Sequence, residues 1–445
     1  MSTLSIAIVV TFIIGYGFIA LESVTKVNKA AIALLMFVAL WTLFMIDPAQ
    51  YMPGVAADAL ATEAGAAIEH HLGVTGTTIF FLLGAMTIVE IVDQNGGFNF
   101  VREALRTTSK RRLLWRIVGL AFVLSAILDN MTTSIVMAML LNKLVAERKD
   151  RLIYASLIII AANSGGAFSP IGDVTTIMLW NKGLITSGGV IGELLLPSLV
   201  SAVIPALLLM PQLKGELKPV EIKSKGVQSE LTARESKAVF VLGVGGLIFV
   251  PIFRYLTGLP PFVGILLVLG VLWTATEIFY RSKKSADGVP FKKRVSNVIR
   301  SIDMSTILFF LGILMAVSCL EQIDVLALAG KWLDGASGGN HYLVTGVIGV
   351  ASSIVDNVPL VAACMGMYPM AALGDFACDG IFWQLLAYCA GVGGSLLIIG
   401  SAAGVVVMGI EKITFGWYMK HITWVAFLGY LAGIVCYWAI NLLIR

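Results

Sequence analysis

Two similar polar motifs interrupt long apolar stretches of the chain and supply the residues best suited to ion chemistry. Residues 125–133 read Ser-Ala-Ile-Leu-Asp-Asn-Met-Thr-Thr, and residues 352–360 read Ser-Ser-Ile-Val-Asp-Asn-Val-Pro-Leu. A carboxylate in the middle of a bilayer costs at least about 2.5 kcal/mol on insertion scales, so it is rarely without a function. Asn adds a carbonyl oxygen, and oxygen-rich sites suit a small hard cation. The motifs therefore predict cation ligands at Asp129, Asn130, Asp356 and Asn357.

The same Asp-Asn pairs are also good helix N-caps, so each pair could instead only cap the second arm of a helical hairpin. Pro359 supplies no backbone donor just after the second pair, which is consistent with a helix break at that point. Both interpretations place a hairpin tip at each motif. The repetition of the pair at two mid-membrane positions favours ion binding over capping alone.

Two glycine-rich segments interrupt two further apolar spans. Residues 163–173 read Asn-Ser-Gly-Gly-Ala-Phe-Ser-Pro-Ile-Gly-Asp, and residues 391–401 read Gly-Val-Gly-Gly-Ser-Leu-Leu-Ile-Ile-Gly-Ser. Glycine and Pro170 allow a helix to unwind, and unwound backbone within a membrane is tolerated only against protein or a cavity. The broken ends direct helix dipoles and carbonyl groups toward a ligand. Close helix packing is the alternative for four of the glycines, namely Gly165, Gly166, Gly393 and Gly394.

The two glycine-rich segments end differently, because Asp173 closes the first and Ser401 closes the second. Helix packing does not need an acid at this position, so Asp173 is predicted to be either a cation ligand or a proton carrier. Glu90 lies deeper in its apolar span than Asp93 and is the better candidate for ion or proton access. Nearby hydroxyl groups could add ligands or bond back to helix carbonyls; they belong to Thr132, Thr133, Thr175, Thr176 and Ser395.

The composition shows that these motifs belong to a membrane protein. Of the 445 residues, 58% are hydrophobic and 13% are charged, which is about half the charged fraction of a soluble globular protein. The mean hydropathy is +0.91, and a net charge of +4 is too small to form a nucleic-acid surface. These values exclude a disordered chain, a soluble multidomain enzyme and a nucleic-acid binder. The five cysteines lack paired spacing and predict neither a disulfide framework nor a metal site.

Apolar runs long enough to span a bilayer recur along the whole chain. The predicted spans are 4–21, 29–46, 77–96, 152–181, 187–210, 238–256, 260–280, 302–320, 382–410 and 421–443. The first is interpreted as a spanning helix and not as a removable signal, because no basic region precedes it. Two longer runs, 113–142 and 343–373, each carry one Asp-Asn motif near the centre.

Charged linkers predict how these elements face the two sides of the membrane. Basic residues cluster at 102–116, 143–151, 214–237 and 281–300, whereas 47–76 and 374–380 contain acids but no Lys or Arg. The positive-inside rule places the basic clusters in the cytoplasm and the acidic segments outside. The rule is satisfied throughout only if 113–142 enters and leaves on the cytoplasmic side and 343–373 on the outer side. Both runs are therefore predicted to be re-entrant hairpins or closely spaced helix pairs.

An internal repeat relates the two halves of the chain. A shift of 227 or 228 residues aligns three blocks in order, which include the pairs Gly84 and Gly312, Asp129 and Asp356, and Gly172 and Gly400. An odd number of membrane crossings separates the copies, so the second copy is inverted. Inverted repeats with interrupted helices are typical of secondary transporters. The predicted fold is an all-α polytopic membrane protein, an inverted-repeat transporter with two re-entrant helical hairpins and two broken helices.

The predicted organisation has four parts. Residues 1–76 contain two spanning helices and an outer segment, in which His70 and His71 are expected in a solvated loop. Residues 77–237 form repeat 1 with the hairpin 113–142. Residues 238–301 contain connecting helices and a basic loop, and residues 302–445 form repeat 2 with the hairpin 343–373.

The buried acids predict a transport mechanism. Desolvation makes a carboxylate easier to protonate, so protons and a small cation would compete for the same oxygens. Competition at a site that is exposed alternately to each side is sufficient for cation/proton exchange. Two or more such acids would let more than one proton return for each cation and make the exchange electrogenic. The fixed negative charge also argues against an anionic substrate.

These motifs resemble those of the NhaD-type sodium/proton antiporters, members of a superfamily that also holds arsenite permeases and sodium-coupled dicarboxylate carriers. The resemblance runs from about residue 77 to the C-terminus. It implies expulsion of Na⁺, often also Li⁺, in exchange for H⁺ across the bacterial inner membrane, by a homodimer with an elevator-like moving domain and no cofactor. Motif match implies cation or proton roles for Asp129, Asn130, Asn163, Asp173, Ser352, Asp356 and Asn357. The supporting positions around them are Glu90, Thr132, Thr133, Ser164, Gly165, Gly166, Thr176, Gly393, Gly394 and Ser395.

Other functions remain as alternatives on the same scaffold. Dicarboxylate carriers of the superfamily have Ser-Asn-Thr at the hairpin tips, and the Asp residues at 129 and 356 favour a free cation instead. The nearest rival is an arsenite, oxyanion or sodium-coupled carboxylate permease. An intramembrane enzyme is disfavoured because no nucleophile–base pair or metal-ligand cluster accompanies the acids. The sequence leaves open the preference among Na⁺, Li⁺ and K⁺, the stoichiometry, the pH range and the oligomeric state.

Overall fold

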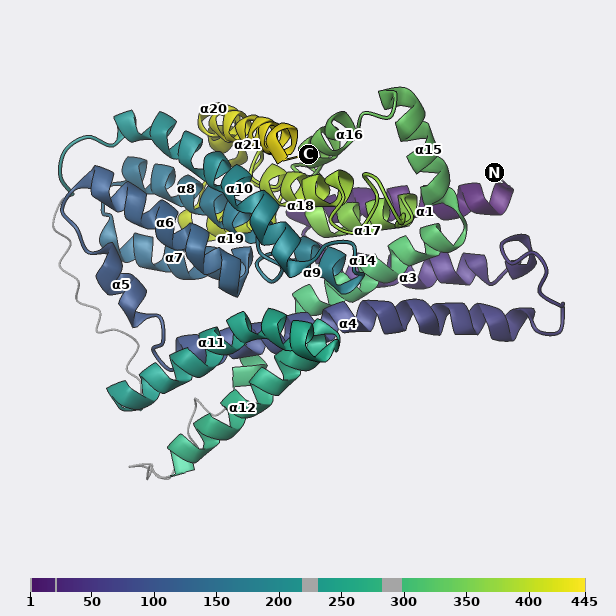
Figure 1. Cartoon of the computed structure of the whole chain (residues 1–445), viewed down its shortest axis with the longest axis horizontal. Coiled ribbons are helices and arrows are strands. Elements are labelled where there is room, and N and C mark those ends of the chain that lie inside the picture. The colour runs from purple at the N-terminus through teal and green to yellow at the C-terminus, as the bar shows by residue number, and fades with distance from the viewer. Residues whose placement is uncertain (1, 21, 218–230, 282–297, 445) are drawn as a thin grey trace.

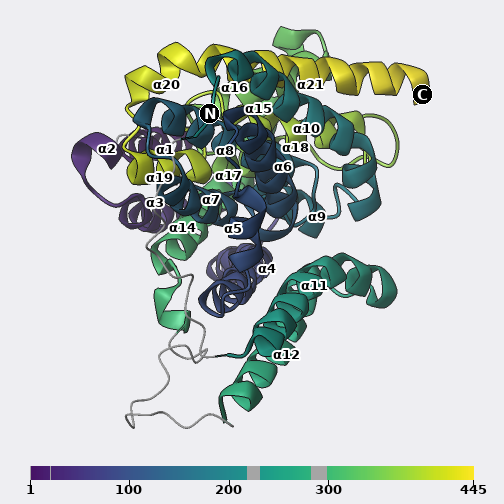
Figure 2. The same ribbon diagram turned by 90° about the vertical axis from the view of Figure 1, so that its left-hand side faces the viewer.

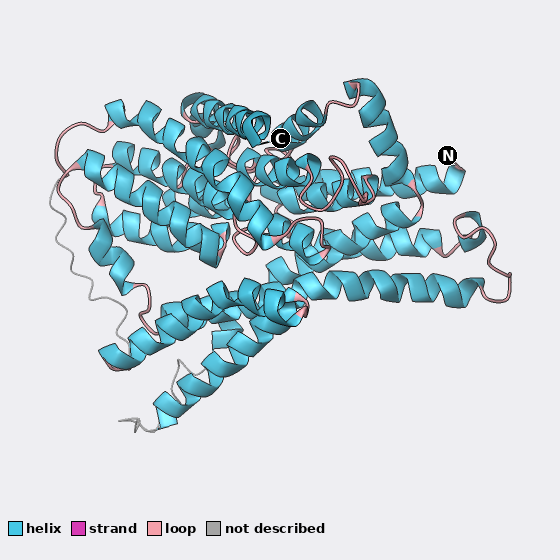
Figure 3. Ribbon diagram, in the orientation of Figure 1, coloured by secondary structure: helices cyan, strands magenta, loops and turns pink. Residues whose placement is uncertain are grey.

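The computed structural model of the chain consists of helices joined by loops (Figure 1, Figure 3). It describes residues 2–20, 22–217, 231–281 and 298–444. Within this part of the chain no strand is formed, and one bridge joins Ser109 to Glu216. The predicted all-α class is confirmed. Much of the basic clusters 214–237 and 281–300 lies outside the described residues.

The helices follow the predicted apolar runs. Among the described residues, six helices are long and apolar enough to cross a bilayer; they are α4 (Leu60–Gln94), α10 (Ser187–Leu209), α11 (Ala233–Thr257), α12 (Pro261–Arg281), α14 (Met304–Gln322) and α21 (Thr423–Ile444). The N-terminal apolar helices are shorter and comprise α1 (Thr3–Ala20) and α3 (Lys29–Phe44). The short connecting helices are α2 (Glu22–Thr25), α5 (Asn99–Leu105), α15 (Val325–Ser337) and α20 (Phe415–His421).

The segment before residue 77 differs from the sequence-based expectation. Helix α4 begins at Leu60, so His70 and His71 lie on a helix and not in a loop. The His71 Nε2 atom is 3.1 Å from Oε1 of Gln322. Residues 60–76 are too polar to resemble a membrane span, but they are rich in alanine, the residue with the highest helix propensity. Extending an existing helix needs no new nucleus, so the apolar half of α4 propagates through this segment.

Each Asp-Asn motif forms the turn between two antiparallel helices. The first turn joins α6 (Lys110–Leu128) to α7 (Asn130–Leu144), and the second joins α16 (His341–Ala351) to α17 (Asn357–Met367). In the first turn a single residue, Asp129, reverses the direction of the chain. Its backbone φ is 84°, a value that residues other than glycine rarely adopt. In Figure 1, α6 and α7 lie on the left, and α16 and α17 lie just right of the centre. Each helix pair carries one copy of the repeated Asp-Asn motif at its turn.

The two glycine-rich segments break helices at corresponding places. The first break separates α8 (Arg148–Ala167) from α9 (Val174–Asn181), and the second separates α18 (Ile381–Gly393) from α19 (Ala402–Glu411). Asp173 caps α9, because its side chain accepts a hydrogen bond from Thr175 N at 3.0 Å. Ser401 caps α19 by accepting one from Gly404 N at 3.2 Å. The residue that differs between the repeats therefore has the same local role in both.

Glycine lets each broken helix approach its hairpin closely. A Cβ atom on Gly165 would lie 2.1 Å from the carbonyl oxygen of Phe122, and a Cβ atom on Gly393 would lie 2.0 Å from that of Gly349. Real Cβ atoms do not approach backbone oxygens to this distance. Helix α8 thus packs on α6 in the same way as α18 packs on α16. The surroundings of Gly165 and Gly393 therefore agree with close helix packing, which was the alternative interpretation of these glycines.

Equivalent serines fasten the same two interfaces. Ser125 Oγ donates a hydrogen bond to the carbonyl oxygen of Ala162 at 2.6 Å. Its repeat mate Ser352 donates to the carbonyl oxygen of Ala390 at 2.8 Å. Both serines are fully buried, so these bonds hold each hairpin against the helix that precedes the break.

The two repeats interlock at the breaks. Helix α7 packs against α19, α9 packs against α17, and α8 packs against α18. A second group of helices flanks this core, in which α14 packs between α3 and α4, and α11 and α12 pack on α4. Figure 2 shows α12 on the outside of this group and α4 toward the core, and α11 also contacts α6 of the first hairpin. The breaks are thereby enclosed in protein, whereas the tip of the second hairpin is partly exposed at Ile354.

The packing generates a prediction for Gly393→Ala. The added methyl group would overlap the carbonyl group of Gly349, so we expect a loss of about 1–3 kcal/mol in unfolding free energy. The measurement is the thermal unfolding of the purified protein in detergent. The matched control is Gly409→Ala on α19, where a Cβ atom meets nothing within 4 Å. Equal unfolding temperatures for the two variants would contradict the close-packing assignment.

Candidate ion-binding site

Asp173 is the most enclosed carboxylate among the predicted ligands. It is 1% exposed, and its Oδ1 atom accepts hydrogen bonds from the Thr175 N–H and hydroxyl groups, each at 3.0 Å. Its Oδ2 atom accepts from Nδ2 of Asn130 at 2.9 Å and from Nδ2 of Asn357 at 3.4 Å. Only an ionised carboxylate accepts at every position, so these four donors stabilise the charged form of Asp173.

Asn163 joins the first repeat to the second. Its Oδ1 atom accepts a hydrogen bond from Nδ2 of Asn130 at 3.0 Å. Its own Nδ2 group donates to the hydroxyl oxygens of Ser395 and Ser401, both at 2.9 Å. Asn163 is 0% exposed, so all these bonds are formed without solvent. The break of the second repeat thus supplies the acceptors that orient Asn163, and Asn163 orients Asn130.

Asp129 holds the tip of the first hairpin. Its Oδ1 atom accepts from Thr132 N at 2.7 Å, and its Oδ2 atom accepts from the Thr132 hydroxyl at 2.8 Å. The capping interpretation therefore describes the contacts of this carboxylate. Asp129 and Asp356 also lie within electrostatic range of Asp173. Three carboxylates from two repeats are gathered in one region, and each of them caps a helix that begins there.

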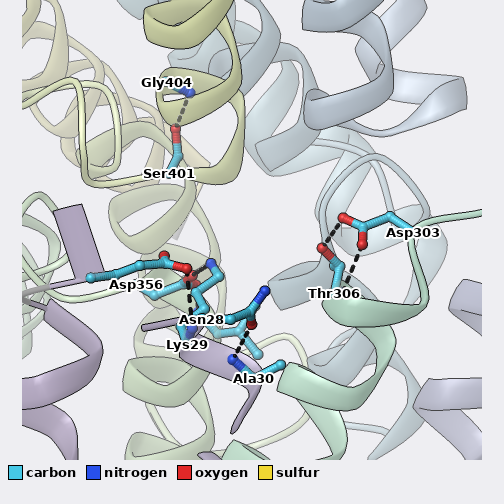
Figure 4. A network of polar contacts seen from close by, with 10 residues as sticks. Asn28, Lys29, Ala30, Asp303, Thr306, Asp356, Ser401 and Gly404 are labelled. Atoms are coloured by element: carbon cyan, nitrogen blue, oxygen red, sulfur yellow. Dashed lines mark hydrogen bonds and ion pairs between the residues drawn. The ribbon is translucent and has the colours of Figure 1, made fainter. Parts of the chain in front are cut away.

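Asp356 holds the tip of the second hairpin but has an additional partner. Its Oδ1 atom accepts from Val358 N at 3.2 Å, and its Oδ2 atom lies 3.4 Å from Nζ of Lys29 on α3. Figure 4 shows the two side chains facing each other beside Asn28 and Ala30. The two hairpin carboxylates are therefore unequal, because Asp129 is bonded within its own hairpin and Asp356 is paired with a cation from another helix.

The predicted hydroxyl ligands are divided between the site and its supports. Thr133 Oγ1 is buried and has no hydrogen-bond partner among the described residues, so its oxygen is available to a ligand. The Thr176 hydroxyl donates to the backbone oxygen of Asp173 at 2.8 Å, and Ser164 accepts from Ser201 at 2.9 Å. Ser352 is engaged by the backbone of Ala390. The hydroxyl groups of Thr176, Ser164 and Ser352 are therefore engaged by the protein, and these residues act by positioning the site.

Gly166 and Gly394 shape the two helix breaks. A Cβ atom on Gly166 would lie 2.5 Å from the carbonyl oxygen of Gly172, and one on Gly394 would lie 3.1 Å from that of Gly400. Each break folds back on its own helix end at these positions. Gly391, which the sequence reasoning did not single out, faces the site itself, because a Cβ atom there would lie 3.5 Å from Oδ2 of Asp173.

Glu90 lies apart from this network. Its Oε1 atom accepts from Nε2 of Gln94 at 2.7 Å and from the Ser301 hydroxyl at 3.0 Å. Within the described residues, no hydrogen bond connects it to Asp173 or to either hairpin tip. The structure also reveals one charged partner that the sequence reasoning missed, Lys29. A lysine at the start of an apolar run usually extends toward the membrane surface. The position of Lys29 in the sequence therefore did not indicate a partner in a distant segment.

Two cavities lie among the helices that carry or flank the site. A cavity of about 300 Å³ lies between α4, α9, α14 and α17, and its polar lining includes His71, Asn181 and Glu321. The amide atoms of Asn181 are buried without a hydrogen-bond partner among the described residues. A second cavity of about 590 Å³ is lined by Tyr16, Glu22, Lys29 and Asp356. Asp356 lines this second cavity directly, whereas Asp173 is sealed.

The asparagine amides allow the arrangement to respond to a proton or to a cation. An Asn amide carries a donor and an acceptor at one end. The amides of Asn130 and Asn357 donate to Oδ2 of Asp173 in this structure. Rotated about its last side-chain bond, the Asn357 amide presents its oxygen, which suits either a protonated Asp173 or a bound cation. The same rotation of Asn130 would also break its bond to Oδ1 of Asn163. The described residues contain no cluster of three or more His, Cys, Asp or Glu that would hold a transition metal.

Comparison with known proteins identifies relatives across almost the whole chain. The family model described as citrate transporter matches residues 16–383. Sodium/proton antiporter 1 of Arabidopsis thaliana is 44% identical over 98% of this chain and 72% of its own length. The Na⁺/H⁺ antiporter NhaD of Vibrio cholerae is 32% identical over 99% of this chain and 92% of its own.

A solved structure shares the fold at much lower sequence identity. The YdaH transporter of Alcanivorax borkumensis, reported to have an unusual topology, aligns with a TM-score of 0.61 and 12% identity. The alignment covers 91% of this chain and 97% of the other. At this identity the likeness concerns the fold alone.

The site geometry generates a prediction for Asn163→Ala. The substitution removes two donors and one acceptor from a fully buried network, and unsatisfied buried groups cost about 1–3 kcal/mol. We therefore expect a lower unfolding temperature in detergent. The control is Asn441→Ala near the end of α21, where the amide makes one hydrogen bond, to Tyr437 O. An unfolding temperature like that of the control would show that Asn163 does not connect the repeats.

Proposed function

The chain belongs to the citrate transporter family of the ion transporter superfamily, together with the NhaD sodium/proton antiporters, and we propose that it expels Na⁺ from the cell in exchange for H⁺. It is a multi-pass membrane transporter and not an enzyme. The relatives named as Na⁺/H⁺ antiporters support cation/proton exchange as the activity. Li⁺ is proposed as a second substrate because it is a small hard cation of the same charge.

The observation that carries the proposal is the pairing of Asp173 with two asparagines. A buried carboxylate is stable as an ion only with donors or a cation beside it. Asn130 and Asn357 supply the donors, and the same side chains supply oxygens when a cation or a proton arrives. Cation and proton then use the same atoms and exclude each other. Mutual exclusion at one site is the requirement for exchange.

Alternating access would come from the interlocked repeats. Asn163, Ser395 and Ser401 join the two breaks, so the breaks move together with the hairpins that pack on them. The helices α3, α4 and α14 form the surface against which this unit would move. The cavity beside Asn181 and the cavity beside Lys29 would serve as access from the two sides. We place the basic loops in the cytoplasm and the protein in the bacterial inner membrane, as a homodimer.

Two further carboxylates bear on the stoichiometry. Asp129 and Asp356 each have oxygens at a hairpin tip, within electrostatic range of Asp173. Two or more titrating acids would return more than one proton for each cation, so the exchange would be electrogenic. The Asp173 and Ser401 difference between repeats means that the second break contributes a hydroxyl oxygen and no charge.

A carboxylate or oxyanion permease is the alternative that the family description suggests. An anion would need positive groups, and of the three lysines that line the two cavities, Lys29 is paired with Asp356 and Lys182 with Glu321. Asp356 lines one of these cavities, and Asp129 and Asp173 add further negative charge nearby. The charge balance therefore supports a cation as the cargo.

Proton flux in everted membrane vesicles tests the proposed function. An inside-acid gradient is formed and then challenged with NaCl, LiCl or KCl. We expect Na⁺ and Li⁺ to collapse the gradient, and we expect Asp129→Asn, Asp173→Asn and Asp356→Asn to abolish the response while the proteins still insert. The control is Asp58→Asn on the exposed outer segment, which keeps the response. Absence of any alkali-cation response in the wild type would exclude the proposal, and arsenite and citrate uptake would then be measured.

Competition also predicts the sign of the pH dependence. Protons occupy the carboxylates at lower pH, so the concentration of Na⁺ for half-maximal exchange should fall as the pH rises. One competing proton changes this concentration by about tenfold for each pH unit over the range in which the site is protonated. The measurement is the Na⁺ dependence of the same flux at several pH values. A half-maximal concentration independent of pH would rule out a shared site.

A further inference from the structure

The ion pair between Lys29 and Asp356 lies in a partly enclosed place. The Nζ atom is 3.4 Å from Oδ2, and the side chains are 28% and 18% exposed. The ammonium group also lies 4.3 Å from the centre of the Phe309 ring on α14, close enough for a cation–π interaction. The lysine side chain is thus held over an aromatic surface and directed at the hairpin tip (Figure 4).

Lys29 stands on a firmly attached part of the molecule. The preceding residue, Asn28, caps α3 by accepting from Ala30 N at 2.8 Å, and its amide donates to Ser305 Oγ on α14 at 2.9 Å. Further along the same interface, a Cβ atom on Gly312 would lie 2.6 Å from the carbonyl carbon of Ala33. Helices α3 and α14 therefore pack closely along their length, and Lys29 has a fixed base.

Asp356 belongs to the other group of helices. It lies between α16 and α17, which pack on α18 and α9. The ion pair thus joins the hairpin unit to the helices against which it would move. Among the described residues, the side-chain hydrogen bonds of Asp129, at the equivalent position of the first repeat, stay within its own hairpin. The connection is therefore present in one repeat and not in its mate.

The pair is reachable by ions, and the lysine has another partner nearby. Both residues line the cavity of about 590 Å³ that also contains Glu22 and Lys26. The Oε1 atom of Glu22 already accepts a hydrogen bond from the backbone N–H of Lys29 at 3.1 Å. If a cation occupies Asp356, the ammonium group has a carboxylate within the same cavity to which it can turn. Exchange of partners leaves no charge unpaired.

We propose that the Lys29–Asp356 ion pair is a tether that prevents the unloaded hairpin unit from moving, so that exchange is obligatory. This inference rests on the function proposed above and adds its coupling device. A proton neutralises Asp356 and a cation replaces the ammonium group, so either substrate releases the tether. With neither bound, the attraction holds the hairpin to α3. An exchanger needs this behaviour, because movement of the empty carrier would allow Na⁺ to leak.

The test compares two fluxes of radioactive Na⁺ from proteoliposomes at alkaline pH, with the membrane potential clamped by an ionophore. Efflux into a medium containing Na⁺ needs only loaded carriers. Efflux into a Na⁺-free medium needs the return of empty ones when the pH is high enough that a further rise no longer changes this flux, so that return with a bound proton does not contribute. In the wild type we expect the first flux to exceed the second by at least about tenfold, and we expect Lys29→Gln to raise the second by about tenfold, as for loss of a partly buried ion pair.

Three matched variants accompany Lys29→Gln. Lys29→Arg keeps the charge and should behave as the wild type does. Lys26→Gln removes a positive charge from the same cavity without touching the pair with Asp356, and it should also keep the wild-type ratio of fluxes. Lys29→Met retains an apolar chain over Phe309 and replaces Lys29→Gln in the assay if the latter does not fold.

The outcomes separate this inference from the proposed function. A wild type without Na⁺/Na⁺ exchange contradicts the proposed function itself. A wild type that exchanges, together with an unchanged ratio of fluxes in Lys29→Gln, overturns the tether alone. Loss of both fluxes in a folded Lys29→Gln protein also overturns it, because Lys29 would then be needed for movement and not for restraint. A selective rise of efflux into the Na⁺-free medium supports the tether.

Discussion

A carboxylate that is sealed from water sets the constraint on which the rest of the arrangement depends. Asp173 is 1% exposed, and an ionised group at such a place is stable only if protein donors replace its hydration. Asn130, Asn357 and Thr175 supply them, from both hairpins and from α9. No single element carries enough donors, so the two repeats must meet at this point. The interlocked breaks and hairpins follow from that requirement.

Glycine and serine make the meeting possible. The hairpins and the broken helices can approach closely only where a Cβ atom is missing, as at Gly165 and Gly393. Buried Ser125 and Ser352 then use neighbouring carbonyl groups that a packed helix leaves accessible. The same glycine and serine contacts recur in both halves because the two halves carry the same repeated sequence pattern. Close approach of a hairpin to a broken helix is also required in both.

Chemistry, in contrast to packing, is divided unequally between the repeats. Asp173 faces the site in one break and Ser401 occupies the equivalent place in the other. Asn163 connects the repeats, whereas its repeat mate Gly391 leaves space beside Asp173. The hairpin carboxylates differ as well, because only Asp356 has a lysine partner. A symmetric scaffold thus carries one asymmetric site, in which charge, ligand oxygens and mechanical restraint fall on different residues.

The sequence by itself determined the helical class, the positions of the hairpin turns and breaks, and the residues that gather around Asp173. The length of apolar runs, the residue types at turns and the internal repeat are local or periodic properties of the chain, so they can be identified from the sequence. The tertiary structure alone decided which groups are partners. Ser352 was expected to be a ligand and bonds instead to a backbone carbonyl, residues 60–76 extend a helix, and Lys29 meets a carboxylate more than 300 positions away. Contacts between distant segments depend on how helices pack, and side-chain type and spacing along the chain do not record that packing.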